Sequence, residues 1–172
     1  MDVQIFTTGG TIDKVYFDAQ SSFSVGEPQI VEILRTAGAS FSFECEHLLQ
    51  KDSLDLTDTD RRLIASAVAE SPAHSIIVTH GTDTMIETAK VVLNALGTDT
   101  SKTVVFVGSL TPARFKATDA EFNIGFAAAA VQTLPPGVYV TMNGRVFNPS
   151  EVRKNRSLNQ FEPLATTRQS DS

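Results

Sequence analysis

The stretch His80-Gly81-Thr82-Asp83-Thr84 joins two unlike apolar segments, and it constrains the fold more than any other part of the chain. Residues 75–79 are β-branched and apolar, as in a buried strand, whereas residues 85–96 place apolar side chains at helical spacing. A strand therefore enters the turn and a helix leaves it. The unpaired N–H groups and the positive dipole end at the start of that helix predict a pocket for an anionic or polar group.

Strand and helix patterns alternate about four times along the chain. Strands are expected at residues 3–6, 41–45, 75–79, 103–107 and 138–142, and helices at 28–38, 57–68, 85–96 and 118–134. Pro28 is expected in the first turn of its helix. This order predicts an α/β fold with a mostly parallel sheet flanked by helices.

Two hairpins complete the expected fold. Residues 12–25 have no helical period and are expected to form a hairpin or a mobile flap. Asn143-Gly144 is a strong hairpin signal, with residues 145–147 as the returning strand of a C-terminal β-hairpin.

Four segments follow directly after expected strands, and the connectivity places them on one edge of the sheet. They are the turn at residues 7–11, the loop at Ser53, the turn at residues 80–84 and the loop at Ser109. Ligands of parallel α/β sheets bind beyond the carboxyl ends of the strands. This edge is therefore the expected binding site.

Composition narrows the class of protein. A length of 172 residues fits one domain, expected over residues 1–165 with a polar tail at 166–172. The net charge of -6 argues against a nucleic-acid partner. No apolar run reaches the roughly 18 residues of a membrane helix, and the first residues do not resemble a signal peptide, so we expect a cytoplasmic protein with no membrane partner.

The residues that could mark a metal or nucleotide site do not form one. His47, His74 and His80 are too far apart to imply a shared metal, and the glycine pair at residues 9–10 fits neither nucleotide-binding pattern. Cys45 has no partner for a disulfide and is expected to be a buried small hydrophobe. Four acidic residues are expected in a loop and a solvated helix N-terminus: Asp52, Asp55, Asp58 and Asp60.

Thr82 and Asp83 alone could be helix caps, and Thr11 alone could be an ordinary turn residue. The coincidence of two turns favours a functional interpretation. Each turn follows a strand, and each presents threonine hydroxyls beside glycine, so both would face one crevice.

These motifs resemble those of the bacterial-type L-asparaginase family, which includes the glutaminase-asparaginases. The matching stretches are Thr8-Gly9-Gly10-Thr11-Ile12, residues 79–85, residues 104–108 and Val140-Thr141-Met142-Asn143. The resemblance runs from about Val3 to Lys154 and corresponds to the family's N-terminal domain, a flavodoxin-like or Rossmann-like fold. It implies hydrolysis of the side-chain amide of L-asparagine without a metal or an organic cofactor.

The resemblance also implies roles for individual residues. Thr11 would be the nucleophile that forms an acyl-enzyme, and a second catalytic group would consist of Thr82, Asp83 and Lys154. Ser53 would hold the α-carboxylate of the substrate, and Asp83 would also hold its α-ammonium. Gly10 and Gly81 would contribute backbone to the substrate site, and the N–H groups of residues 81–83 are candidates for the oxyanion site.

Two departures from the family pattern matter. The family's tyrosine before a Val-Gly pair is Phe23 here, and Tyr16 is the obvious substitute. The family's C-terminal domain has no counterpart in this sequence. Tyr16 as phenolate and Lys154 as neutral amine are the candidate bases, and the sequence does not apportion the role between them.

Two other functions remain open. The substrate could be glutamine or another small amide, because one methylene changes discrimination by only about 1 to 3 kcal/mol. Alternatively, Phe23 would suit an amino-acid-binding module that has lost its chemistry. In each case we expect a homo-oligomer, since the family's sites lie at interfaces and residues 145–147 would form an edge strand.

Overall fold

The computed structural model describes residues 2–17 and 22–164, with the backbone alone at residues 16, 17, 22 and 23. The expected tail at residues 166–172 lies outside this range. The main sheet contains β1 (Asp2–Gly9), β4 (Ser42–Lys51), β5 (Ser75–Thr79), β6 (Thr103–Val107), β7 (Gly137–Met142) and β8 (Arg145–Phe147). The helices are α1 (Ile30–Thr36), α2 (Asp58–Glu70), α3 (Met85–Leu96) and α4 (Ala120–Thr133).

The sheet is mostly parallel, as expected. Its strand order is β4-β1-β5-β6-β7-β8, and only β8 runs antiparallel to its neighbour. The chain moves outward from β1 to β4 and then returns to the other side of β1 at β5. The carboxyl ends of β1 and β5 therefore form the switch point at which ligands of such sheets bind.

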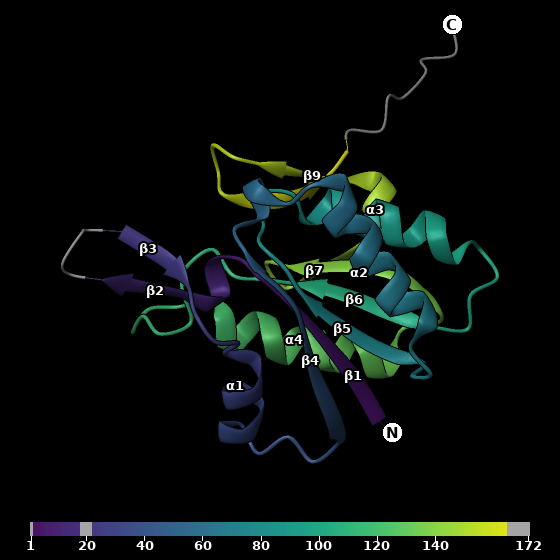
Figure 1. Ribbon diagram of the computed structural model, residues 1–172, viewed down its shortest axis with the longest axis horizontal. Helices are drawn as coiled ribbons and strands as arrows, with labels where there is room; N and C mark the ends of the chain where they lie inside the picture. Colours follow the sequence, from purple (N-terminus) through teal and green to yellow (C-terminus); the bar gives the residue numbers. More distant parts are fainter. Residues whose placement is uncertain (1, 18–21, 165–172) are drawn as a thin grey trace, which may run out of the picture.

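Helices cover both faces of the sheet, with α1 and α4 on one side and α2 and α3 on the other (Figure 1). Successive side chains along each strand point to opposite faces, so each strand contributes to the two hydrophobic cores on either side of the sheet. Ile5 and Ile77 pack toward α1 and α4, whereas Phe6 and Val78 pack toward α2 and α3. Both faces of the central strands are therefore buried, which explains their continuous apolar sequence.

Thr57 and Asp60 form a capping box at the start of α2. The hairpin turn that the sequence predicted is also present. Asn143 and Gly144, with φ of 54° and 70°, make the tight turn between β7 and β8. The prediction that Pro28 lies in the first turn of its helix was wrong: it precedes Gln29, the N-cap of α1, and the helix begins only at Ile30.

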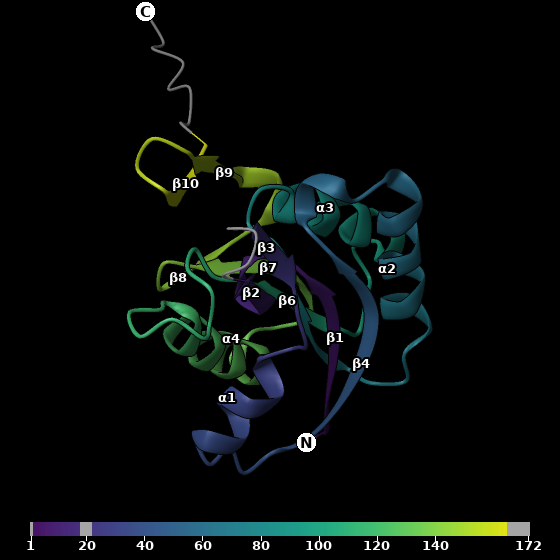
Figure 2. The same cartoon turned by 60° about the vertical axis from the view of Figure 1, so that its left-hand side comes forward.

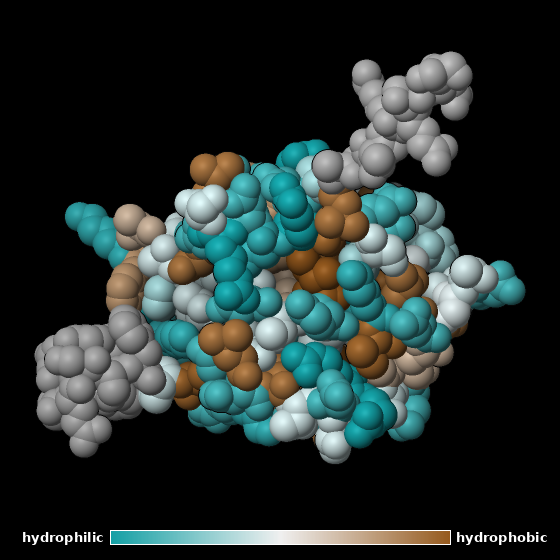
Figure 3. All heavy atoms as spheres, turned by 90° about the horizontal axis from the view of Figure 1, so that it is seen from above, coloured by the Kyte–Doolittle hydropathy of each residue, from teal (hydrophilic) through white to brown (hydrophobic). Residues whose placement is uncertain are grey.

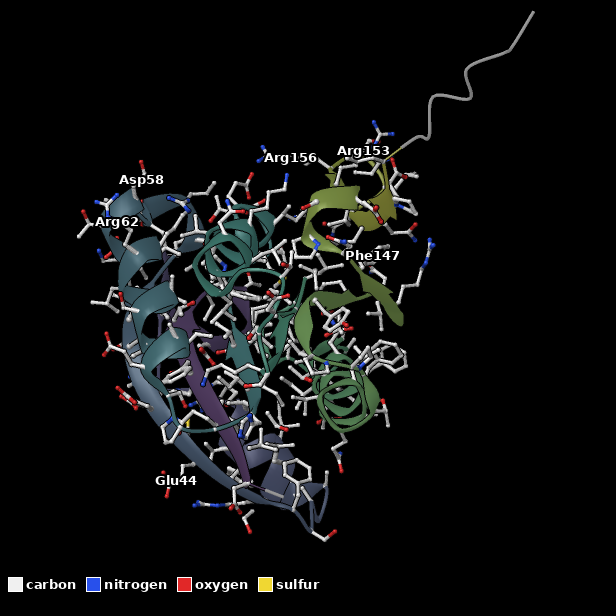
Figure 4. All side chains as sticks on the ribbon, turned by 90° about the vertical axis from the view of Figure 1, so that its right-hand side faces the viewer. Glu44, Asp58, Arg62, Phe147, Arg153 and Arg156 are labelled. Carbon is white, nitrogen blue, oxygen red and sulfur yellow. The ribbon has the colours of Figure 1, made fainter. Side chains whose placement is uncertain are left out.

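The prediction for Cys45 was also wrong. Cys45 is exposed on β4, and so are its neighbours Glu44, Glu46 and His47. β4 lies at the edge of the sheet, paired only with β1 among the described strands, and the flanking helices do not cover its middle. Figure 4 shows Glu44 extending outward from this strand. Charged side chains on an exposed edge discourage pairing with other chains.

Two small antiparallel sheets lie outside the main one. The expected hairpin at residues 12–25 consists of β2 (Lys14–Phe17) and β3 (Ser22–Val25), and it projects beyond the carboxyl ends of the strands (Figure 1). A second hairpin, which the sequence did not predict, consists of β9 (Val152–Asn155) and β10 (Gln160–Pro163). Figure 2 shows it standing beside α3, apart from the main sheet.

The surface above α2, α3 and the β9–β10 hairpin is mixed in character, with apolar side chains in separate patches among hydrophilic ones (Figure 3). In the part of the chain that the structure describes, no helix combines the length and the apolarity that a bilayer crossing requires.

Candidate active site

The turns after β1, β4 and β5 meet in close contact at one edge of the sheet. A Cβ atom added to Gly10 would overlap the backbone of Gly81, and one added to Gly81 would lie 2.6 Å from the side chain of Ser53. The N–H of Gly10 also donates to the carbonyl of Lys51, at the end of β4. Glycine at both positions therefore lets the three turns approach more closely than side chains would allow.

The loop after β6 joins this group. A Cβ atom on Gly108 would overlap the carbonyl oxygen of His80, and the N–H of His80 donates to the carbonyl of Val107 at 2.9 Å. All four segments that the sequence placed on one edge thus lie there. Ser109 itself turns back locally, because its hydroxyl donates to the carbonyl of Thr111.

Thr11 is the first residue of a short 3-10 helix, η1 (Thr11–Asp13), which begins directly after Gly10. Ile12 is buried and anchors this turn in the core beneath α1 and α4. Thr11 itself is half-buried, and its hydroxyl makes no hydrogen bond within the described residues. A hydroxyl held at a fixed place without a partner is available to a ligand.

Thr82, Asp83 and Lys154 form a connected group. The Nζ atom of Lys154 donates to Oγ1 of Thr82 at 2.8 Å and to Oδ1 of Asp83 at 2.9 Å. The Lys154 side chain is only 12% exposed, against 35% for Asp83. Lys154 is therefore not the solvated surface lysine that its basic neighbours in sequence could suggest.

The strand β9 explains why Lys154 alone turns inward. Side chains alternate along a strand, so Arg153 and Lys154 point to opposite sides. Arg153 pairs with Glu162 at the surface and is 58% exposed, and Figure 4 shows it extending outward from the hairpin.

Other side chains hold the turns in place. The hydroxyl of Thr84 donates to the carbonyl of Ser53 at 2.7 Å, and that of Thr8 donates to the carbonyl of Thr79 at 2.8 Å. The first bond links the turn after β5 to the loop after β4, and the second links the ends of β1 and β5. Hydroxyl contacts thus hold the segments of the site together.

His80 is a structural member of the group. It is fully buried, and its Nδ1–H donates to the carbonyl of Gly81 at 2.8 Å. Burial lowers the pKa of His80 to about 4. The hydrogen bond to the carbonyl of Gly81 opposes this shift, and the charge of Arg61 adds a smaller lowering. A histidine that is neutral near pH 7 and bound to the backbone of the turn supports its shape.

Tyr16 lies on β2, and its backbone is directly opposite that of Phe23 on β3. Its side chain lies outside the part of the molecule that the structure describes. The base of this hairpin is tied to the site: Lys14 forms a 2.6 Å ion pair with Asp52, next to Ser53.

Sequence reasoning missed Asp13, which is 2% exposed and directly follows the buried Ile12. One carboxylate oxygen accepts the N–H of Gln29 at 2.9 Å. Burial raises the pKa of Asp13 to about 7, against the opposing effects of that hydrogen bond and of Arg114. An aspartate in a turn gives no sequence signal that it will be buried.

The acidic residues after β4 have structural roles, as expected. Asp52 caps η2 (Ser53–Asp55), Asp60 completes the capping box and binds Lys51, and Asp58 pairs with Arg61. Across residues 2–17 and 22–164, no cluster of three or more histidine, cysteine or acidic side chains could hold a metal ion.

A protein-family model matches nearly the whole chain. Residues 2–167 match the family model described as "Asparaginase, N-terminal". The chain is 29% identical over 169 residues to a glutaminase-asparaginase from Acinetobacter glutaminasificans, an alignment that covers 89% of this chain and 49% of the relative. The chain spans about half the length of the curated relatives it matches.

Two solved structures share the fold. The thermostable L-asparaginase from Thermococcus kodakarensis superposes with a TM-score of 0.82 at 26% identity, over 96% of this chain and 52% of that one. The probable cytoplasmic L-asparaginase from Campylobacter jejuni gives a TM-score of 0.75 at 29% identity, over 94% of this chain and 52% of that one.

Proposed function

The chain belongs to the asparaginase family, and from this premise we propose that it hydrolyses the side-chain amide of L-asparagine to L-aspartate and ammonia. The observation that carries the proposal is the bonded group of Thr82, Asp83 and Lys154 beside the turn that presents Thr11. A carboxamide is a poor electrophile, so its hydrolysis needs an activated nucleophile, a proton source for ammonia and donors for the oxyanion.

In the proposed first step, the oxygen of Thr11 attacks the amide carbon while a base takes its proton. The C–N bond then breaks, the nitrogen leaves as ammonia with a proton from the enzyme, and an ester to Thr11 remains. In the second step water attacks this ester, which releases L-aspartate and returns the proton to Thr11. No cofactor is needed in either step.

The residues of the site can be assigned to these steps. Lys154, bound to the Thr82 hydroxyl, would pass protons between that hydroxyl and the reacting groups. Tyr16 is the alternative base for Thr11. The N–H groups of residues 81–83 would stabilise the oxyanion, because they lie in the turn that leads into the N-terminal end of α3.

Substrate binding is assigned to the remaining polar groups. Oδ1 of Asp83 is taken by Lys154, and we propose that its other oxygen holds the α-ammonium of the substrate. Ser53, which contacts the Gly81 turn, would hold the α-carboxylate. Gly10 and Gly81 would contribute backbone groups to the substrate site.

A glutamine preference is the second candidate, because the relative from Acinetobacter glutaminasificans is named a glutaminase-asparaginase. The pocket would then have to accept one more methylene. We also propose a cytoplasmic location, in keeping with the name of the relative from Campylobacter jejuni.

We propose, finally, that the active form is a homo-oligomer. Among the described strands β8 is an edge strand of the main sheet, and a second copy of the chain could pair there. Sedimentation at micromolar concentration together with activity tests this idea. A fully active monomer would contradict it.

One set of assays separates these functions. Ammonia release is measured from L-asparagine and from L-glutamine, and L-aspartate binding is measured by calorimetry. Faster turnover of asparagine supports the main proposal, and faster turnover of glutamine supports the second. Saturable binding of aspartate without any turnover would instead identify a binding module.

A further inference from the structure

We propose that Asn143 is a positioning residue for Lys154, acting through the backbone N–H of Phe161. The inference rests on the proposed function of the group formed by Thr82, Asp83 and Lys154. Asn143 lies in the turn between β7 and β8, where its sequence context indicates only a tight hairpin.

The placement of Lys154 depends on the β9–β10 hairpin. Lys154 is directly opposite Phe161 in this two-stranded sheet, which does not pair with the main sheet among the described strands. An isolated hairpin of this size is marginally stable in water. The contacts that attach the hairpin to the rest of the protein therefore decide where the Lys154 ammonium lies.

Two apolar residues attach the hairpin to the core. Val152 and Phe161 are each 2% exposed and pack in the cluster beneath α2 and α3. Apolar packing holds the hairpin against the core. Because this interaction is non-directional, it does not closely fix the rotation of the hairpin. A directional contact is needed to hold an ammonium at hydrogen-bond distance from Thr82.

The side chain of Asn143 supplies this directional contact. Its Oδ1 atom accepts the N–H of Phe161 at 2.9 Å, across 18 positions of sequence. The amide of a buried residue would otherwise be left without a partner, which is costly. The same bond fixes β10 in the position from which its partner strand directs Lys154 toward Thr82 and Asp83.

The turn itself does not require the Asn143 side chain. A φ of 54° is as accessible to glycine as to asparagine, so glycine could replace Asn143 without strain in the backbone. The asparagine side chain adds the oxygen that accepts the N–H of Phe161. Aspartate would keep both the acceptor and the tolerance of left-handed backbone.

The test compares Asn143→Gly with Asn143→Asp. The matched control is Asn159→Gly, because Asn159 also has a positive φ of 50°, lies in the β9–β10 turn and is exposed. The first measurement is the rate at which acetic anhydride acylates Lys154 relative to the exposed Lys90, read by peptide mass spectrometry. The second is kcat and KM for ammonia release from asparagine.

We expect Asn143→Gly to raise the acylation ratio of Lys154 to Lys90 about fivefold, the effect of losing one ordinary hydrogen bond. We expect kcat to fall by a similar factor with a smaller change in KM. Asn143→Asp and Asn159→Gly should each stay within about twofold of the wild type in both measurements.

An unchanged acylation ratio in Asn143→Gly would overturn the proposal, and so would an equal change in Asn159→Gly. The acylation measurement does not need activity. If the wild type released no ammonia but the ratio still rose in Asn143→Gly alone, the positioning role would stand and the proposed hydrolysis would fail.

Discussion

The ammonium of Lys154 lies 2.8 Å from the hydroxyl of Thr82, although 72 positions separate the two residues. Thr82 comes from a turn at the centre of the main sheet, and Lys154 comes from a hairpin outside it. Packing of the hairpin against the core brings them together. In our account this contact makes Thr82 part of a proton-transferring group rather than a simple helix cap.

The first prediction concerns Lys154 itself. Lys154→Met should lower kcat for ammonia release by about a hundredfold or more. A hundredfold is the smallest rate effect typical of a side chain that transfers protons in catalysis. Thermal unfolding separates a loss of chemistry from a loss of fold, because Lys154→Met also removes the partner of the half-buried Asp83. Arg153→Met is the control, since this residue is on the same strand but binds Glu162 at the surface. Equal kcat losses in both variants would contradict the assignment.

The second prediction tests the close approach of the turns. Gly10→Ala should abolish activity and destabilise the fold, because the added methyl would overlap the backbone of Gly81. Gly97→Ala is a matched control: its backbone, with φ of 72° and ψ of -178°, resembles that of Gly10 at 93° and -173°, but its Cβ would meet nothing within 4 Å.

Both glycine variants should lose about 1 to 3 kcal/mol of unfolding free energy for the strained backbone. Only Gly10→Ala should show a further loss of stability and of turnover. Urea unfolding and ammonia release measure the two effects. Similar stability and normal activity in both variants would show that the turns tolerate separation.

The third prediction concerns the pH dependence of stability. The pKa of Asp13 is about 7 in the folded protein and 3.8 ordinarily, so between these values the folded state binds a proton that the unfolded state lacks. Asp13 therefore lowers stability increasingly as the pH rises from about 4 to 7. Asp13→Asn keeps an acceptor for the N–H of Gln29 but does not ionise.

Urea unfolding at pH 5 and pH 8 measures the effect. The stability of Asp13→Asn relative to the wild type should increase by about 2 to 3 kcal/mol between these two pH values, at 1.36 kcal/mol for each pKa unit. A constant difference would mean that Asp13 stays ionised in the folded protein over this range.

The fourth prediction concerns the base. Tyr16→Phe should lower kcat if Tyr16 takes the place of the family tyrosine that is Phe23 in this chain. Its effect on L-aspartate binding should be smaller. An unchanged kcat would return the role of the base to another residue.

The sequence was sufficient to predict the central layers of the fold. The strands at residues 75–79 and 103–107 are apolar throughout, because both of their faces are buried, and the turn at residues 80–84 follows from the change of period after them. The convergence of four post-strand segments followed from parallel connectivity alone.

The remaining features depend on contacts between distant segments. Cys45 has the alternating pattern of a half-buried strand, yet it lies on an edge that the helices leave uncovered. The hairpin that carries Lys154 is short and polar, and it is attached by the burial of Val152 and Phe161 and by the hydrogen bond from the N–H of Phe161 to Asn143. Local patterns report neither kind of contact. Lys154 was assigned to the site only through the family resemblance, and the contact of Asn143 with the hairpin became visible only in the structure.

The most direct test of the two-threonine site is ammonia release from L-asparagine by Thr11→Ala and Thr82→Ala, each compared with the wild type. We predict that each substitution abolishes turnover while circular dichroism shows an intact fold, because Thr11 would supply the nucleophile and Thr82 the hydroxyl bound to Lys154. Near-normal turnover in either variant would contradict the account.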